Sequence, residues 1–248
     1  MESGIHIILK GEELVTVFGL PITNGLLMAW VVVAVIVAFA FFAGRSLRLV
    51  PGKLQAGIEF VYESAHDYIA EVLESKKLAT VFFPLLSTIF LFIFVSNELA
   101  FLPGVGSMGL FHHDHFTPLL RAPAADLNFT LALAAIAFLI IEIAGLVVLG
   151  TAKYGKKYLN FSSPVHFITG IIEIASNLGR LISFSFRLFG NVFAGEVMIV
   201  VVGFFLSYLL PAPVIAFEMF VGLVQAVVFA MLTLFFIKLS IIDPHEQH

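Results

Sequence analysis

The sequence predicts an all-α polytopic membrane protein with about five membrane-embedded helices and one amphipathic surface helix. Apolar residues fill 60% of the 248 positions, whereas soluble globular domains have roughly 45 to 50%. Charged residues account for only 12%, and the mean hydropathy is +1.06. The apolar residues are gathered in long runs, which is typical of membrane spans. This composition gives no basis for nucleic-acid binding, and we expect a single membrane domain over residues 1–248.

Five apolar segments are long enough to cross a membrane, since about 20 mostly apolar residues span a hydrocarbon core of roughly 30 Å. The fourth has no proline from Val165 to Leu210, and at about 1.5 Å per residue it would form a helix near 70 Å long. Such a helix must break, tilt strongly or lie aslant. The expected membrane-embedded helices are residues 25–43, 81–102, 127–150, 163–210 and 214–240.

Residues 54–74 have the pattern of an amphipathic helix at the membrane surface, with apolar side chains on one side and acidic side chains on the other. An acidic face does not attract anionic lipids, so it favours a protein neighbour, although a solvated face is the simpler explanation. The apolar positions are Leu54, Ile58, Val61, Tyr62, Ala65, Ile69 and Val72, and the acidic ones are Glu59, Glu63, Asp67, Glu71 and Glu74.

Basic residues orient the helices, because lysine and arginine in short loops favour the cytoplasmic side. If the fourth segment crosses once, only Lys10 and Arg121 lie on the outer side, which places the N-terminus outside and the C-terminus on the cytoplasmic side. The basic residues that then share the cytoplasmic side are Arg45, Arg48, Lys53, Lys76, Lys77, Lys153, Lys156, Lys157 and Lys238.

Polar residues in the fourth segment form one stripe. Their successive spacings of 3, 4, 3, 4 and 4 place them within about 40° of Arg187 around a helix axis. A charged residue at the centre of a membrane helix costs roughly 2.5 to 3.5 kcal/mol, so the two arginines must face protein, water or a mobile counter-ion. The stripe is therefore a candidate functional site. Its members are Glu173, Ser176, Arg180, Ser183, Arg187 and Asn191.

The two arginines of the stripe differ in their sequence surroundings. Arg180 has Glu173 and Asn177 within two turns, so a structural pairing explains it as well as a functional role does. Arg187 has no acid within one turn, which predicts a partner on another helix. An acid of this chain would make a static salt bridge, whereas a second subunit could present a succession of carboxylates. Arginine stays protonated, so it can hold a carboxylate ionised but cannot relay protons. The intrachain candidates are Glu98, Glu142 and Glu218.

Two further acids are isolated in apolar runs. Glu196 lies nine residues beyond Arg187, about 180° around the helix. Glu218 shares a face with Gln225, and Gly222 between them allows close approach of another helix or of water. Such acids often mark ion paths, so both are candidates for a proton relay, and a neutral, hydrogen-bonded structural role is the alternative.

No cofactor or metal site is expected. The chain has no cysteine, which excludes a thiolate metal site. The adjacent residues His112, His113, Asp114 and His115 scatter their side chains in a loop and do not favour metal binding. There is also no P-loop, so the chain is not expected to hydrolyse ATP by that route.

The run SFRLFGNVFAGEV at residues 185–197 resembles subunit a of the F-type ATP synthase, the membrane stator subunit that faces the rotating c-ring. The resemblance extends through the rest of the stripe, the Gln225-Ala226 pair, Asn97 with the LPGVG run, and residues 126–130. It covers nearly the whole chain apart from the N-terminal segment and the histidine loop.

This resemblance implies a role for each candidate residue. Arg187 matches the arginine that separates two aqueous half-channels and releases protons from each passing c subunit. Asn191 and Gln225 match polar positions near that arginine. Glu196 and Glu218 match the proton-uptake pair, in which the family uses glutamate or histidine; two glutamates leave open which one is the principal carrier. We further hypothesise that protons leave towards the cytoplasm along the part of the stripe formed by Ser183, Ser176 and Glu173.

The same resemblance implies the surroundings and the function. The last two helices would form a tilted hairpin against the c-ring, and the peripheral stalk b subunits would be further partners. The chain would be a non-catalytic, proton-conducting subunit of an energy-transducing membrane, either the bacterial inner membrane or the mitochondrial inner membrane. Sodium in place of the proton stays an alternative, because the c-ring carboxylate site that selects the ion belongs to another chain.

A self-contained, proton-coupled secondary transporter is the alternative function from another class. Such folds usually show paired repeats and helices broken near the membrane midplane, and the sequence shows no repeat. A transporter of this kind would work as a purified single chain, whereas a stator subunit needs its partners.

Overall fold

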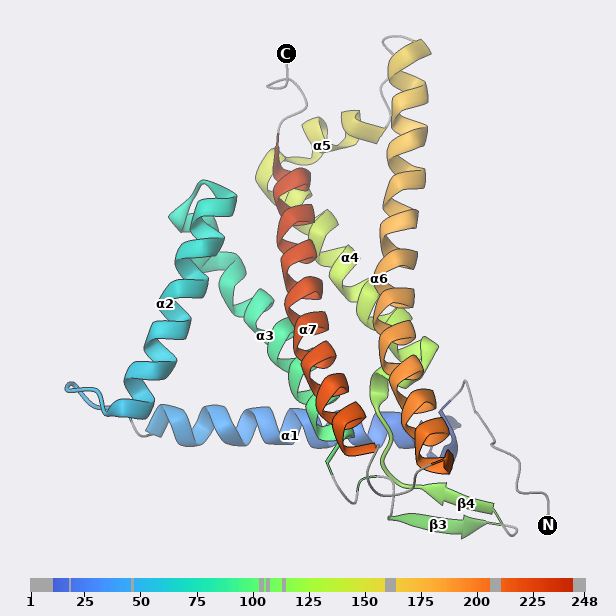
Figure 1. Cartoon of the computed structure of the whole chain (residues 1–248). Helices are drawn as coiled ribbons and strands as arrows, with labels where there is room; N and C mark the ends of the chain where they lie inside the picture. The colour runs from blue at the N-terminus through green and yellow to red at the C-terminus, as the bar shows by residue number, and fades with distance from the viewer. Residues whose placement is uncertain are drawn as a thin grey trace.

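The computed structural model describes residues 11–17, 19–45, 47–102, 105, 108–112, 115–158, 164–205 and 211–242. Helices dominate these residues, and two short antiparallel hairpins precede α1 and α4 (Figure 1). The elements are β1 (Glu13–Val17), β2 (Leu20–Thr23), α1 (Asn24–Arg45), α2 (Lys53–Leu73), α3 (Lys76–Ala100), β3 (Gly109–His112), β4 (His115–Pro118), the 3-10 helix η1 (Pro123–Ala125), α4 (Leu127–Leu149), α5 (Thr151–Tyr158), α6 (Pro164–Phe205) and α7 (Pro211–Ile241).

Five of the described helices, α1, α3, α4, α6 and α7, are long and apolar enough to cross a membrane. The predicted fold class, an all-α polytopic membrane protein, is therefore confirmed. Many large apolar side chains of these helices are exposed on the isolated chain, which fits lipid or another membrane subunit as their natural surroundings.

The core lies where α3 and α4 pack against α7, and α6 packs on α4 and α7. Small residues at these contacts let the helix backbones approach closely, as in other membrane bundles; Ala134, Ala137 and Ala226 are all buried. Aromatic rings fill the remaining space, with the ring centroids of Phe184 and Phe229 4.8 Å apart. These contacts hold α6 and α7 side by side.

Helix α6 is one continuous helix of 42 residues. At about 1.5 Å per residue it is roughly 63 Å long, about twice the hydrocarbon thickness. We expected a helix of this length to break, tilt strongly or lie aslant. The described residues of α6 contain no break. Figure 1 shows α6 and α7 running alongside each other, with α1 lying across their direction at one end. Helix α1 has no charged residue before its last one, Arg45, and its length matches the thickness of the bilayer. If α1 crosses the membrane, the crossing angle favours a strong tilt of α6 and α7.

The amphipathic segment forms α2, which packs on α3. Its C-cap Glu74 has a left-handed backbone with φ of 54°, and the Ser75 side chain accepts a hydrogen bond from the Leu78 amide at 3.3 Å. This cap starts α3 at Lys76, five residues before the expected residue 81. Helix α7 likewise starts at Pro211 rather than at 214, because proline is compatible with the first turn of a helix.

Candidate functional site

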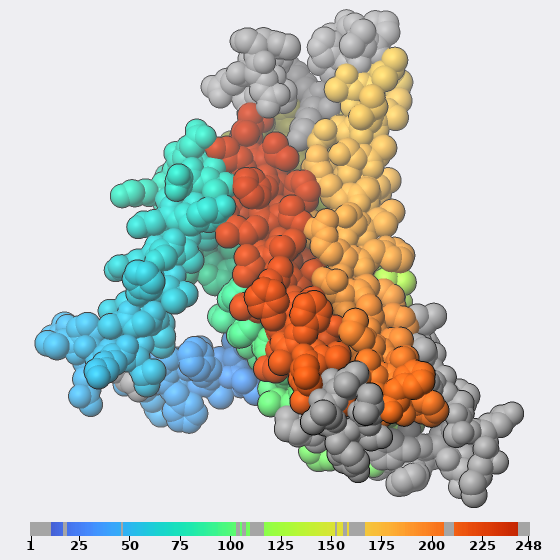
Figure 2. All heavy atoms as spheres, viewed as in Figure 1, coloured from blue at the N-terminus to red at the C-terminus, as the bar shows by residue number. Residues whose placement is uncertain are grey.

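The polar stripe lies along α6 as the spacing predicts, because that helix is unbroken. Glu173 and Arg180 are half-buried, whereas Ser176, Ser183, Arg187 and Asn191 are exposed. In Figure 2, α6 and α7 lie next to each other on the viewed face, and most of their length there is uncovered. Exposed apolar side chains flank the stripe, including Ile182 and Phe186.

Arg187 has one hydrogen-bond partner in the described part of the chain, since its Nη2 donates to Ser183 Oγ at 3.4 Å. No described carboxylate lies within ion-pair distance of it. None of the three intrachain candidates therefore forms the static salt bridge that the sequence left open. An exposed guanidinium without a carboxylate partner is costly in a membrane and calls for a partner outside the chain.

Arg180 is paired within the stripe. Its Nη2 lies 3.5 Å from Glu173 Oε1, and its guanidinium lies 4.9 Å from the centre of the Phe236 ring. Of its two predicted partners, Glu173 is the one found. This contact favours the structural explanation for Arg180.

Glu218 lies at a small pocket between α3, α6 and α7. Its side chain is only 6% exposed, and a Cβ built on Gly195 would come within 2.3 Å of Glu218 Oε2, so the carboxyl packs directly on the α6 backbone. The pocket has room for about one water molecule. It is lined by Asn97, Phe101, Asn191, Val192, Glu218, Val221, Gly222 and Gln225.

Hydrogen bonds join this pocket to the stripe. Asn191 Nδ2 donates to Gln225 Oε1 at 2.6 Å, and Asn97 Nδ2 donates to the Gly222 carbonyl at 3.2 Å. Asn97 Oδ1 and Gln225 Nε2 are buried without a partner among the described residues. A water molecule in the pocket could donate a hydrogen bond to the Asn97 oxygen and accept one from the Gln225 nitrogen. The structure thus brings Glu218, Gln225 and Asn191 together.

Glu196, which is isolated in its apolar run, has a charged partner from a distant segment of the chain. Arg121, in the loop before α4, donates to Glu196 Oε2 from Nη2 at 2.9 Å and from Nε at 3.2 Å. The two side chains are 15% and 27% exposed, respectively. The sequence contained one indication of this partner, because Arg121 is one of only two basic residues that it places on the same side as the N-terminus. Tertiary folding then brings the loop to α6 across 75 residues.

Glu142 also has partners that the sequence did not indicate, namely Tyr154 and Tyr158 of α5 and Asn177 of α6. No group of three or more potential metal ligands occurs among the residues that the structure describes. His112 and His115 belong to β3 and β4, while His113 and Asp114 lie outside the described residues.

The fold defines a helical, multi-pass membrane protein, and α6 carries a stripe of polar side chains. A family model described as ATP synthase A chain matches residues 26–238. Similar curated proteins include ATP synthase subunit a 3 of Pelobacter propionicus, 30% identical over 87% of this chain and 86% of the relative. The subunit a of Mycobacterium tuberculosis is 32% identical over 86% of this chain and 85% of that protein, and that of Campylobacter jejuni subsp. jejuni is 33% identical over 81% of both.

The chain belongs to the family of subunit a of the F-type ATP synthase. As a member it is a non-catalytic, multi-pass membrane subunit of the synthase, with a role in proton translocation by the membrane sector.

Proposed function

We propose that this chain provides two aqueous half-channels to the carboxylates of a c-subunit ring, and that Arg187 separates them. The observation that supports this most is that Arg187 of α6 is exposed and has no carboxylate partner in the described part of the chain. A rotating neighbour would supply carboxylates to it one after another. In this arrangement α6 and α7 form the tilted hairpin that faces the ring.

The uptake half-channel opens on the outer side and contains the Glu218 pocket. Protons pass Glu218 and Glu196 and load a ring carboxylate near Asn191 and Gln225. The Asn191–Gln225 hydrogen bond and the water-sized pocket beside Glu218 support this route. Arg121, which is bonded to Glu196, belongs to the outer end of the same path.

The exit half-channel follows Ser183, Ser176 and Glu173 along α6 towards the cytoplasmic side. Two of these side chains are exposed and the third is half-buried, so water can reach all three. The cytoplasmic assignment rests on the placement of the basic residues, with the N-terminus outside. The acidic face of α2 is the surface offered to the peripheral stalk b subunits.

Arg187 blocks a direct proton path between the half-channels through its charge. Two unit charges about 4 Å apart interact by about 4 kcal/mol at an effective dielectric constant near 20. A barrier of this size slows proton leakage roughly a thousandfold.

Replacing Arg187 with alanine in the assembled synthase tests this function. ATP-driven proton pumping into membrane vesicles should vanish while ATP hydrolysis and complex assembly persist. Arg45→Ala is the matched control, because Arg45 is also exposed but lies on α1, over the Phe41 ring; it should pump normally. Preserved pumping by Arg187→Ala would contradict the proposal.

Family membership leaves the secondary transporter without support. That alternative would require the purified chain alone to catalyse coupled exchange in liposomes, and the stator role predicts that it does not.

A further inference from the structure

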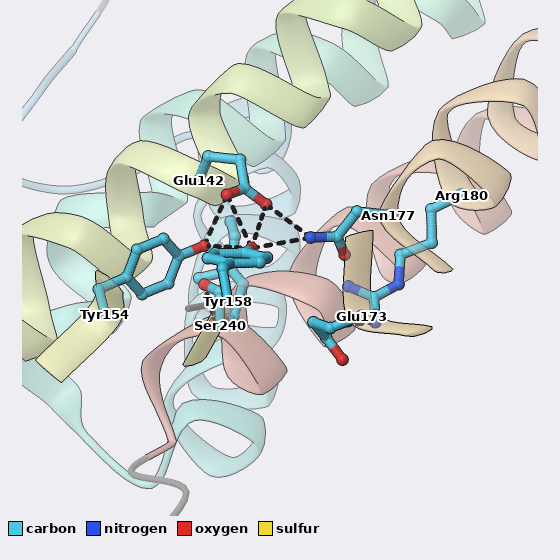
Figure 3. A network of polar contacts seen from close by, with 8 residues as sticks. Glu142, Tyr154, Tyr158, Glu173, Asn177, Arg180 and Ser240 are labelled. Atoms are coloured by element: carbon cyan, nitrogen blue, oxygen red, sulfur yellow. Dashed lines mark hydrogen bonds and ion pairs between the residues drawn. The ribbon is translucent and has the colours of Figure 1, made fainter. Parts of the chain in front are cut away.

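A second polar cluster lies beside the stripe, where α4, α5 and α6 meet (Figure 3). We name it the Glu142 cluster; it consists of Glu142, Tyr154, Tyr158 and Asn177. The Tyr154 and Tyr158 hydroxyls donate to Glu142 Oε2 at 2.8 and 2.9 Å. Asn177 Nδ2 donates to Glu142 Oε1 at 3.3 Å and to the Tyr158 hydroxyl at 2.8 Å. Three residues from two other helices thus converge on one membrane carboxyl.

Two glycines allow these contacts. A Cβ on Gly145 would lie 2.3 Å from Tyr154 Cε2, so only glycine leaves room for that ring. A Cβ on Gly170 would lie 2.1 Å from the Tyr158 carbonyl oxygen, so α5 packs directly on the α6 backbone. Tyr154 and Asn177 are each only 5% exposed. The cluster is therefore a packed site rather than a chance contact of surface side chains.

The hydrogen bonds of the cluster can be satisfied with Glu142 either ionised or protonated. When it is ionised, both hydroxyls donate to its oxygens. The two hydroxyl oxygens are also 3.2 Å apart, and either can be the donor. When Glu142 is protonated, it can donate to the Tyr158 oxygen, Tyr158 can donate to Tyr154, and Tyr154 can still donate to Glu142. Only hydroxyl hydrogens turn, so a proton can be gained or lost without moving heavy atoms.

The tyrosines themselves do not change charge in this exchange. Burial, the neighbouring tyrosine hydroxyl and the Glu142 carboxyl raise the pKa of Tyr154 far above its usual value of 10. Burial is also the main cause that raises the pKa of Tyr158. Both phenols therefore stay protonated over the physiological range. Glu142 carries the only carboxyl group of the cluster.

Asn177 connects the cluster to the stripe. It lies one turn from both Glu173 and Arg180 on α6, and Figure 3 shows that ion pair next to the cluster. Its Oδ1 is buried and has no partner among the described residues, which leaves an acceptor for a water molecule. The other described charged groups on the packed elements are Lys153 on α5, Arg187 and Glu196 on α6, and Glu218 and Lys238 on α7. Of these, Lys238 pairs with Glu74 and Glu196 pairs with Arg121.

We propose that Glu142 is a further proton-exchanging residue of the cytoplasmic half-channel, held in place by Tyr154, Tyr158 and Asn177. This inference rests on the proposed function, since it adds a proton store to the exit path of that mechanism. During ATP-driven pumping a proton from cytoplasmic water binds a Glu142 oxygen, and it then leaves through water towards the stripe. In synthesis the same steps run in reverse. Tyr154 and Tyr158 act as positioning residues.

The test is the pH profile of ATP-driven proton pumping by the complete synthase in liposomes, with Glu142→Gln in this chain. Glutamine keeps the size and one acceptor oxygen, replaces the other oxygen with an NH2 donor, and cannot take up a proton. We expect the initial rate to fall about threefold or more near pH 8.5, where protons in water are scarce, and to change less than about twofold near pH 6.5. Glu142→Asp, which keeps a carboxyl group, should restore much of the alkaline rate.

The tyrosines give a second measurement. Tyr154→Phe and Tyr158→Phe should change the profile in the same direction but by less, because Glu142 keeps its other donors. Tyr68→Phe, in an exposed tyrosine of α2, is the matched control and should leave the profile unchanged.

A Glu142→Gln rate that is unchanged, or reduced equally at both pH values, would overturn the inference, because a purely structural role has no pH dependence. Arg187→Ala in the same liposomes separates this failure from failure of the proposed function. If Arg187→Ala abolishes pumping and Glu142→Gln leaves the profile unchanged, only the role of Glu142 is lost. If Arg187→Ala still pumps, the proposed function is lost.

Discussion

The ion pair between Arg121 and Glu196 should stabilise the fold measurably, and a double-mutant cycle can isolate its contribution. The Arg121 Nη2 and Nε atoms both donate to Glu196 Oε2, at 2.9 and 3.2 Å. Both side chains are less than one-third exposed. Breaking a fully buried pair costs about 3 to 5 kcal/mol, because one charge is left without compensation. Partial exposure reduces this, so Arg121→Gln should cost about 2 to 3 kcal/mol.

The Glu196→Gln variant and the double variant should lose less stability than Arg121→Gln. Glu196→Gln keeps an amide oxygen that can accept from the Arg121 guanidinium, and should cost about 1 kcal/mol. The double variant should also cost about 1 kcal/mol, because two glutamines can still bond each other. The coupling energy is then about 2.5 kcal/mol. Urea unfolding in detergent micelles, followed by circular dichroism, measures each corner. A coupling energy below about 0.5 kcal/mol would refute the ion pair.

Two further predictions concern close packing and surface charge. Gly195→Ala should displace the Glu218 carboxyl, because the added Cβ would lie 2.3 Å from Oε2. The end of this flexible side chain can move aside at little cost in stability, but proton pumping should fall severalfold. Gly203→Ala is its control, since nothing lies within 4 Å of that position, and equal pumping by the two variants would contradict the assigned contact. The Lys238 ammonium donates to Glu74 Oε1 and holds the pKa of that exposed carboxyl below its usual 4.5. The folded-state pKa is lowered, so the contribution to stability is present above about pH 4.5 and lost as pH falls through the folded-state value. Lys238→Met should therefore reduce the acid dependence of the thermal unfolding midpoint of the synthase; an unchanged dependence would exclude the contact.

The membrane helices could be predicted from the sequence because lipid requires long apolar runs, and such runs are visible without any tertiary information. The stripe was equally accessible, since the helical period alone aligns Arg187 with Asn191 and Ser183. The sequence shows that residues 163–210 are too long for one upright membrane helix. It does not show whether the helix breaks, tilts or lies aslant. That choice depends on α6 packing against α4 and α7, which no local pattern encodes.

Some of the missed features depend on contacts between segments that are distant in the sequence. Arg121 reaches Glu196 across 75 residues. Helix α5 was not predicted because its eight residues, TAKYGKKY, are too few and too polar to suggest a packed element. Its two tyrosines reach Glu142 only because glycines at 145 and 170 let α5 approach α4 and α6. The two hairpins were missed as well, because short strands lack a strong periodic signal.

The central claim is that the Arg187 face of α6 meets carboxylates of a ring of c subunits. The chain contains no cysteine, so a cysteine introduced by Arg187→Cys can be paired with one placed beside the c-subunit carboxylate. Oxidation links cysteines whose Cα atoms lie within about 7 Å. Leu188→Cys is the matched control, because Leu188 is the next residue in the helix and is only 1% exposed. The account predicts a disulfide-linked product with the c subunit for Arg187→Cys and none for Leu188→Cys. No product with Arg187→Cys, or equal product from both variants, would contradict it.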